Sequence, residues 1–313
     1  MTKLPDAVFT HSLPKIELHA HLTGSITPST LHSIWLHRQE ASTDLTLADP
    51  LETLAKDKTW DIRTFFPLFS SYIYALISTP ETIIWSTNSV LHDFCADEVV
   101  YLELRTTPRS STDVSKNEYI DLVLDCIENF DQKDKMSTCL ILSIDRRNTL
   151  EQAIEVVDLA LTFRDRGIVG IDLCGDPSKG DVSVFAPAFV KAREAGLKIT
   201  LHFAEIPASS SKEELETLLS FQPDRLGHVI CVPEEVKREI QQRRVGVELC
   251  VSCNVQAELT EGGMRDHHFG KWRGGGSPVI LCVSGCWSLS FSFRLYTQDG
   301  SARQTDTVNG NAD

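Results

Sequence analysis

The chain has 313 residues, with 30 Lys and Arg against 44 Asp and Glu, which gives a formal net charge of −14. Hydrophobic residues make up 42% and charged residues 24%, an ordinary globular composition that excludes a disordered, collagen-like or small disulfide-rich chain. The acidic balance argues against nucleic acid as a partner, because binding nucleic acid irrespective of sequence needs a basic surface. A small anionic substrate is still compatible with it, since a few local arginines can outweigh the overall field.

No run approaches the roughly 18 apolar residues of a membrane span, so no membrane partner is expected. The first eleven residues contain Asp6 and lack a basic region followed by an apolar core, so we expect no secretory signal. The nine cysteines are then interpreted as reduced thiols of a cytoplasmic protein. We expect this protein to be a monomer.

Short apolar, β-rich runs recur along the chain, and eight of them are predicted as strands. In chain order they are Ile16–Ala20, Val99–Leu104, Cys139–Ile144, Ile168–Leu173, Leu197–Phe203, Arg225–Ile230, Val245–Cys250 and Pro278–Val283. Segments with helical spacing separate many of them. These are Asn117–Phe130, Leu150–Phe163, Phe185–Glu194, Lys212–Phe221 and Pro233–Gln242. Strands that alternate with helices predict a parallel sheet.

Eight strands over this length predict an α/β fold of the (β/α)8 TIM-barrel type, spanning residues 1–283. An open doubly wound sheet is the alternative, but no G-x-G-x-x-G phosphate loop follows the first strand. A helical insertion is predicted around residues 31–80, where it could cap the barrel mouth. Residues 284–313 are rich in Ser, Thr, Asn and Gly and have no amphipathic period, so we expect a disordered tail instead of a closing helix.

Four histidines lie at or near the ends of predicted strands. His19 and His21 end the first strand, and alternate strand residues point to the same side. His202 and, three residues later, Glu205 end the fifth strand, and His228 lies near the end of the sixth. Single histidines of this kind are often hydrogen-bonded core residues. Four of them at one end of a barrel, where barrel enzymes place their chemistry, favour a common site.

Three neutral imidazoles suit one Zn²⁺ ion and leave a coordination position open for water. Such an ion lowers the pKa of the water toward 7 and produces a nucleophile. Glu205 could then carry protons and His228 could hold the hydroxide, so these residues predict a metal-assisted hydrolase. A further run, Asp266-His267-His268, is interpreted as a polar loop, with a metal site as the alternative.

The motifs around these residues resemble the adenosine deaminase family, from about Leu13 to Cys282. The segments that carry the resemblance are Leu18–Ser25 (LHAHLTGS), Gly170–Asp176 (GIDLCGD), His202–Glu205 (HFAE) and Arg225–His228 (RLGH). Within the family the chain looks most like the adenosine deaminase-like branch, the N6-methyl-AMP deaminases. The segments that suggest this branch are Leu13–Leu18, Tyr101–Arg109 and Asp145–Arg147.

The resemblance implies a (β/α)8 hydrolase that removes ammonia or methylamine from C6 of a purine nucleoside monophosphate and yields IMP. His19, His21 and His202 would bind one Zn²⁺ ion. Glu205 would protonate the purine ring as C6 is attacked, and His228 would position the hydroxide. Residues His21, Thr23, Asp145 and Gly175 would line the substrate pocket.

A 5′-phosphate site is expected after the second strand. The candidates are Arg105, Thr106, Thr107 and Arg109, because guanidinium and hydroxyl donors match phosphate oxygens. The alternative is that these residues form a solvated loop. Whether the substrate is the nucleotide or the nucleoside, as in an adenosine deaminase, stays open.

The chain departs from the family at the end of the eighth strand. The resemblance implies a Thr-Asp-Asp motif there, whose first Asp binds zinc and whose second contacts the purine. Here Val283-Ser284-Gly285 follow Cys282 and supply no carboxylate. Three histidines can still hold zinc, but we expect weaker catalysis. A catalytically impaired pseudoenzyme or splice product is therefore one alternative, and a barrel hydrolase acting on a different amine or amide is another.

Overall fold

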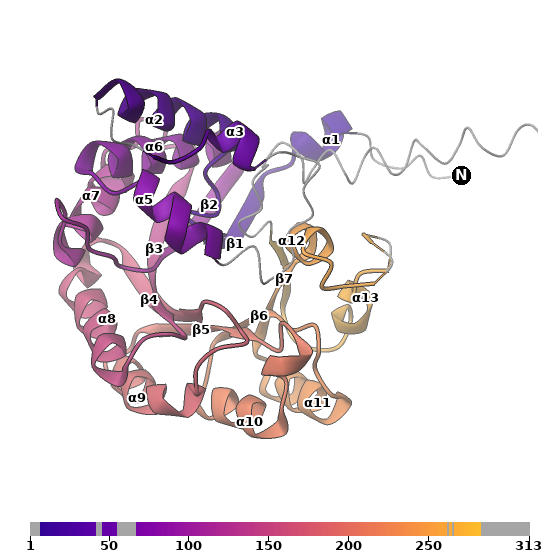
Figure 1. Cartoon of the computed structure of the whole chain (residues 1–313). Coiled ribbons are helices and arrows are strands. Elements are labelled where there is room, and N and C mark those ends of the chain that lie inside the picture. The colour runs from indigo at the N-terminus through magenta and orange to yellow at the C-terminus, as the bar shows by residue number, and fades with distance from the viewer. Residues whose placement is uncertain (1–6, 42–45, 55–66, 262, 265, 283–313) are drawn as a thin grey trace, which may run out of the picture.

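The computed structural model describes residues 7–41, 46–54, 67–261, 263–264 and 266–282. Eight parallel strands pair in the order β1-β2-β3-β4-β5-β6-β7-β8. They curl into a nearly closed barrel with helices around the outside (Figure 1). The predicted (β/α)8 fold is therefore confirmed, and the open doubly wound alternative is excluded.

All eight predicted runs contain a strand, with ends that shift by a few residues. The strands are β1 Lys15–His21, β2 Val99–Thr106, β3 Ser137–Asp145, β4 Ile168–Cys174, β5 Lys198–Phe203, β6 Arg225–His228, β7 Gly246–Cys250 and β8 Val279–Cys282. Each pairs in parallel with the next, and β8 lies beside β1 where the ring closes. The carboxyl ends of all eight strands therefore face one mouth.

The described part of the connection between β1 and β2 is largely helical. Its helices are α2 Pro28–Ala41, α3 Pro50–Thr53, the π-helix η1 Phe69–Ile73, α5 Tyr74–Leu76 and α6 Pro80–Ala96. The other α-helices are α1 Ala7–His11, α7 Lys116–Glu128, α8 Leu150–Thr162, α9 Ala186–Glu194, α10 Lys212–Ser220, α11 Glu234–Arg243, α12 Val251–Gln256 and α13 Phe269–Trp272. The described residues also contain three 3₁₀ turns: η2 Arg164–Arg166, η3 Val182–Phe185 and η4 Pro207–Ser209.

Polar caps fix where several outer helices begin. Ser115 accepts from the backbone N–H of Glu118 while the Glu118 side chain accepts from the Ser115 backbone, and Thr149 and Gln152 do the same for α8. These reciprocal bonds satisfy backbone donors that the first helical turn leaves unpaired. The helices consequently start at defined points after β2 and β3, which fixes the loops at the barrel mouth.

The apolar core lies between the strands and the outer helices, while the inside of the barrel contains buried polar side chains. Among these are Glu103, Arg105, Asp172, Thr200 and Glu248. All eight cysteines within the described residues are free thiols. No helix in the described segments is long and apolar enough to cross a bilayer. The predicted tail over residues 284–313 and the expected loss of a closing helix lie outside the described residues.

Candidate active site

Three imidazoles converge at the barrel mouth. His19 and His21 come from β1, and His202 reaches them from β5. The Nε2 atom of His202 lies 3.2 Å from Nε2 of His19 and 3.1 Å from Nε2 of His21. Nitrogens bound tetrahedrally to one zinc ion at its usual bond length would be about 3.3 Å apart. The donor set and its spacing therefore fit a single zinc-sized ion.

His19 and His21 are held in their neutral form. Burial is the largest cause that lowers the pKa of both imidazoles well below 6.5. The positive charge of Arg105 comes second for His19, whereas His202 comes second for His21. Because a metal ion binds the neutral imidazole, this environment keeps the lone pairs available near pH 7.

A second group of possible ligands shares one histidine with the first. His19, His228 and Cys250 also bring their ligand atoms within 4.8 Å of one another, and all three residues are buried. The Nδ1 atom of His19 lies 2.5 Å from Glu248, so only Nε2 faces the other histidines. His19 can therefore bind only one metal ion at a time, either with His21 and His202 or with His228 and Cys250.

Glu205 and His228 lie next to the three imidazoles. The Glu205 Oε1 atom is 3.6 Å from Nε2 of His228. The other carboxylate oxygen, Oε2, is buried and has no hydrogen-bond partner among the described residues. A buried carboxylate oxygen without a partner is costly. This oxygen is therefore available to a substrate atom that can share a proton with it.

His228 is oriented by its backbone and by two neighbours. Its φ of 65° lies in the left-handed region, where a non-glycine residue is strained. Its Nδ1 atom lies 2.9 Å from Oδ1 of Asn254, and its carbonyl oxygen accepts from Nε2 of His268 at 2.7 Å. The Nδ1–H donates to the amide oxygen, so Nε2 faces Glu205.

A cavity joins these groups to the expected substrate residues. It is lined by His21, Thr23, Gly24, Phe69, Tyr74, Arg105, Thr106, Thr107, Asp145, Arg147, Cys174, Gly175, His202, Glu205, His228 and Cys253. Gly175 has a φ of +98°, and a Cβ atom there would lie 2.9 Å from the carboxylate of Asp145. Only glycine leaves this space open, which lets a ligand approach the backbone closely.

The structure corrects the expected position of Arg105. It lies on the cavity floor, fully buried, instead of at the rim. Its Nη2 donates to the Leu18 carbonyl at 2.5 Å and to Glu248 Oε2 at 2.8 Å, and its Nη1 is 3.2 Å from Asp172 Oδ1. Its Nε and Nη1 have no hydrogen-bond partner among the described residues, but its charge is offset by Glu248 and Asp172, and it lies deeper than a phosphate site at the rim.

The other three phosphate candidates, Thr106, Thr107 and Arg109, do not lie together in the structure. Thr106 and Thr107 line the cavity, but the Thr106 hydroxyl lies 2.6 Å from the Tyr119 hydroxyl. Arg109 is outside the cavity lining. Its guanidinium lies between the rings of Tyr74 and Tyr119, with its carbon 4.7 and 4.5 Å from their centroids. The predicted set therefore does not form one phosphate site.

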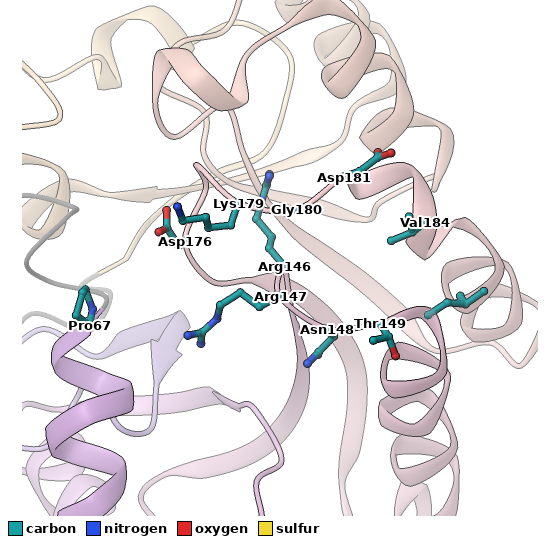
Figure 2. Close-up of a pocket in the computed structure, with 11 residues that line it drawn as sticks. Pro67, Arg146, Arg147, Asn148, Thr149, Asp176, Lys179, Gly180, Asp181 and Val184 are labelled. Atoms are coloured by element: carbon teal, nitrogen blue, oxygen red, sulfur yellow. The ribbon is translucent and has the colours of Figure 1, made fainter.

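Arg147 is a cation at the cavity that the sequence analysis did not single out. Its Nε and Nη2 atoms donate to the two carboxylate oxygens of Asp145, at 2.8 and 2.7 Å. It also lines a neighbouring cavity with Arg146 and Lys179, and Figure 2 shows its side chain extending toward the side where Pro67 lies. Its side chain is 50% exposed, so a ligand can reach it.

Two further residues support the site without having been predicted. Glu248 contacts His19, and Asn254 contacts His228. The signal for Glu248 was available, because a glutamate inside the apolar run of β7 has to find a buried partner. Nothing in the sequence pairs Asn254 with His228, since that contact depends on how α12 follows β7.

The comparisons with known proteins cover most of the chain. The family model described as adenosine deaminase matches residues 14–269. The N6-mAMP deaminase of Arabidopsis thaliana is 36% identical over 307 residues, covering 90% of this chain and 84% of that protein. The human N6-methyl-AMP deaminase is 34% identical over 287 residues, covering 88% and 79%. The crystal structure of Arabidopsis ADAL complexed with IMP has a TM-score of 0.82 at 35% identity, covering 92% and 87%.

Proposed function

The chain belongs to the adenosine deaminase family and is a hydrolytic deaminase, and we propose that its substrate is a purine nucleoside monophosphate carrying an amino or methylamino group at C6. With N6-methyl-AMP, water would replace methylamine to give IMP. One observation carries this proposal: three imidazole Nε2 atoms spaced 3.1 and 3.2 Å apart open onto the cavity that also contains Glu205 and His228.

In this proposal His19, His21 and His202 hold one zinc ion. When bound, zinc supplies a Lewis acid that activates water near neutral pH. Glu205 holds a proton at its carboxylate and gives it to the purine ring nitrogen beside C6 as the ring is attacked. His228 orients the attacking water through Nε2. Its Nδ1–H stays with Asn254, which keeps His228 in one orientation during the reaction.

The remaining pocket residues would bind the nucleotide. Gly175 lets the purine approach the backbone closely, and Thr23 and Asp145 line the pocket beside it. Arg147 is the cation best exposed at the cavity, and we assign it the 5′-phosphate in place of Arg105. Arginine suits this role because its planar fork presents several donors to phosphate oxygens. The relatives named for N6-methyl-AMP and the ADAL complex with IMP support a nucleotide over a nucleoside.

A direct assay tests the proposal. The zinc-loaded chain is mixed with N6-methyl-AMP, AMP, N6-methyladenosine and adenosine in parallel. The deaminated products, IMP and inosine, are measured together with the released amine. We expect IMP and methylamine from N6-methyl-AMP, with nucleosides converted far more slowly. Faster conversion of the nucleosides would overturn the nucleotide assignment, and no conversion of any purine by a folded, zinc-loaded chain would overturn the reaction.

A second candidate function follows from the sequence after β8. Because Val283-Ser284-Gly285 supply no carboxylate, the chain could bind purine nucleotides without turning them over. Such a pseudoenzyme would be folded and loaded with zinc, and it would be stabilised against heat by IMP. The same assay separates the two candidates, because the pseudoenzyme predicts a raised Tm with IMP and no methylamine from N6-methyl-AMP.

A further inference from the structure

Glu248 is a buried carboxylate directly beneath the histidines. Its Oε2 atom lies 2.5 Å from His19 Nδ1 and accepts from Arg105 Nη2 at 2.8 Å. Its Oε1 atom accepts from Thr200 Oγ1 at 3.1 Å and from Arg225 Nε at 2.6 Å. Both carboxylate oxygens are therefore used, and the side chain is held from four directions inside the barrel.

Asp172 on β4 stands behind His202 in a similar way. Its Oδ1 atom lies 3.1 Å from His202 Nδ1 and 3.2 Å from Arg105 Nη1. Its Oδ2 atom accepts from Ser143 Oγ at 3.0 Å. Arg105 on β2 thus contacts both Asp172 on β4 and Glu248 on β7. It therefore links the carboxylate that contacts His202 to the carboxylate that contacts His19.

We propose that Glu248, Asp172 and Arg105 form a positioning cluster that holds His19 and His202 in the orientation needed for one metal ion. Glu248 accepts the Nδ1–H of His19, and Asp172 shares the Nδ1–H of His202 with the Leu173 carbonyl at 3.0 Å, so each Nε2 lone pair points to the mouth. A partner of this kind fixes the tautomer and the ring orientation of a metal-binding histidine. Arg105 in turn fixes the two carboxylates relative to each other. This inference rests on the proposed metal site.

The charges explain why the cluster can be buried. Two bare carboxylates inside the barrel would be strongly unfavourable, and Arg105 offsets both. Burial alone would raise the pKa of Asp172, but His202 and Arg105 outweigh it and lower that pKa. Removing Arg105 would leave Asp172 without its arginine and Glu248 with Arg225 alone, and uncompensated buried charge often prevents folding. The test therefore changes one carboxylate at a time.

Glu103 is a matched control for Glu248. It is also a nearly buried glutamate on a barrel strand, and it also pairs with Arg225. Within the described residues its side chain bonds to Arg225 and Tyr101 and to no histidine. Losing the Glu103 carboxylate therefore weakens the same charged interior without releasing a metal-binding imidazole.

The experiment measures zinc affinity of the full chain by competition with a chelator, after the bound metal has been removed. Urea unfolding of the metal-free proteins checks that each variant folds. We expect Glu248→Gln to raise the zinc Kd about 10- to 100-fold, the usual effect of losing such a partner. Glu103→Gln should change the Kd by less than about threefold, since no histidine is released.

A charge-conserving variant separates orientation from simple attraction. Glu248→Asp keeps the negative charge but shortens the side chain by one methylene, so a positioning role predicts weaker zinc binding here too. Asp172→Asn provides the same test at His202 if Glu248 variants do not fold. Unchanged affinity in folded Glu248→Gln, or an equal loss in Glu103→Gln, overturns the inference alone. Absence of zinc binding by the unsubstituted chain overturns the metal site and this inference together.

Discussion

The Nδ1 atom of His228 and the Oδ1 atom of Asn254 lie 2.9 Å apart in a buried hydrogen bond. This contact joins the end of β6 to α12, and it decides which nitrogen of His228 faces the cavity. The Asn254 amide nitrogen lies 3.2 Å from Nε2 of His267, so its own orientation is fixed from the other side.

Replacing Asn254 by leucine removes this acceptor at nearly constant volume. The His228 ring is then free to rotate or change tautomer, so we expect kcat to fall on the order of 10- to 100-fold, as for other orienting partners. KM should change little, because Asn254 does not line the cavity. Ser252→Ala, a change at a buried neighbour on the same helix, is the control and should leave kcat unaltered.

Glu205 is predicted to be needed for proton transfer and not for metal binding. Glu205→Gln should lower the turnover of N6-methyl-AMP by roughly 10²- to 10⁴-fold, the usual contribution of a positioned acid or base. Zinc content, measured by atomic absorption, should not change. Glu216→Gln alters an exposed glutamate on α10 and serves as the control. Full activity of Glu205→Gln would show that another group supplies the proton.

Arg147 is predicted to distinguish nucleotides from nucleosides. Arg147→Ala should raise the KM for N6-methyl-AMP by about 10-fold or more, because a hydrogen bond to a charged group contributes about 1.5–3 kcal/mol. The KM for N6-methyladenosine should be unchanged, since it has no phosphate. Lys179→Ala removes a cation that lines only the neighbouring cavity, and it should affect neither substrate. An equal effect of Arg147→Ala on both substrates would remove Arg147 from the phosphate site.

His267 and His268 predict how stability depends on pH. Burial, followed by the charge of His228, lowers the pKa of His267 to about 4, and burial, followed by His267, does the same for His268. Unfolded histidines have a pKa near 6.5, so the unfolded chain binds more protons between these values. The free energy of unfolding should therefore be highest above pH 6.5 and should fall as the pH drops toward 4.

Urea unfolding at pH 7.5 and pH 5 measures this loss. His268→Gln removes one of the two groups, so its urea midpoint should fall less between these pH values. Ser33→Ala, a change at an exposed side chain of α2, removes no titratable group and is the control whose pH response should match that of the unsubstituted chain. If the unfolding free energy is the same at both pH values, the two histidines are not kept neutral by the fold.

The barrel could be predicted from the sequence because the strands are short apolar runs and many of them are separated by segments with helical spacing. The histidines could be predicted for a related reason: they come at or near strand ends, and parallel strands bring their ends together. The last residues of each element were less predictable. β6, for example, ends at His228 and not at Ile230, because His228 and Val229 both adopt positive φ.

Arg105 shows what the sequence alone could not reveal. It stands in one run with Thr106, Thr107 and Arg109, but neighbouring strand residues point to opposite faces. Arg105 points into the barrel, whereas Thr106 meets Tyr119 of α7. Which face is which depends on the register of β2 between β1 and β3.

The run Asp266-His267-His268 lies in a loop, as interpreted, but its histidines are not solvated. Both histidines are buried, and they contact Asn254 and His228 from a loop distant in the sequence. A polar composition gives no sign of such a contact, because it depends on where the chain packs after α12. The structure gives no support to a metal site at this run, because His267 already contacts Asn254 and His268 already contacts the His228 carbonyl.

The position of a bound metal ion tests the account most directly. Crystals of the zinc-loaded chain, measured at the zinc absorption edge, should show one anomalous peak about 2.1 Å from Nε2 of each of His19, His21 and His202. A peak among His19, His228 and Cys250, or no peak near these histidines, would contradict the proposed centre.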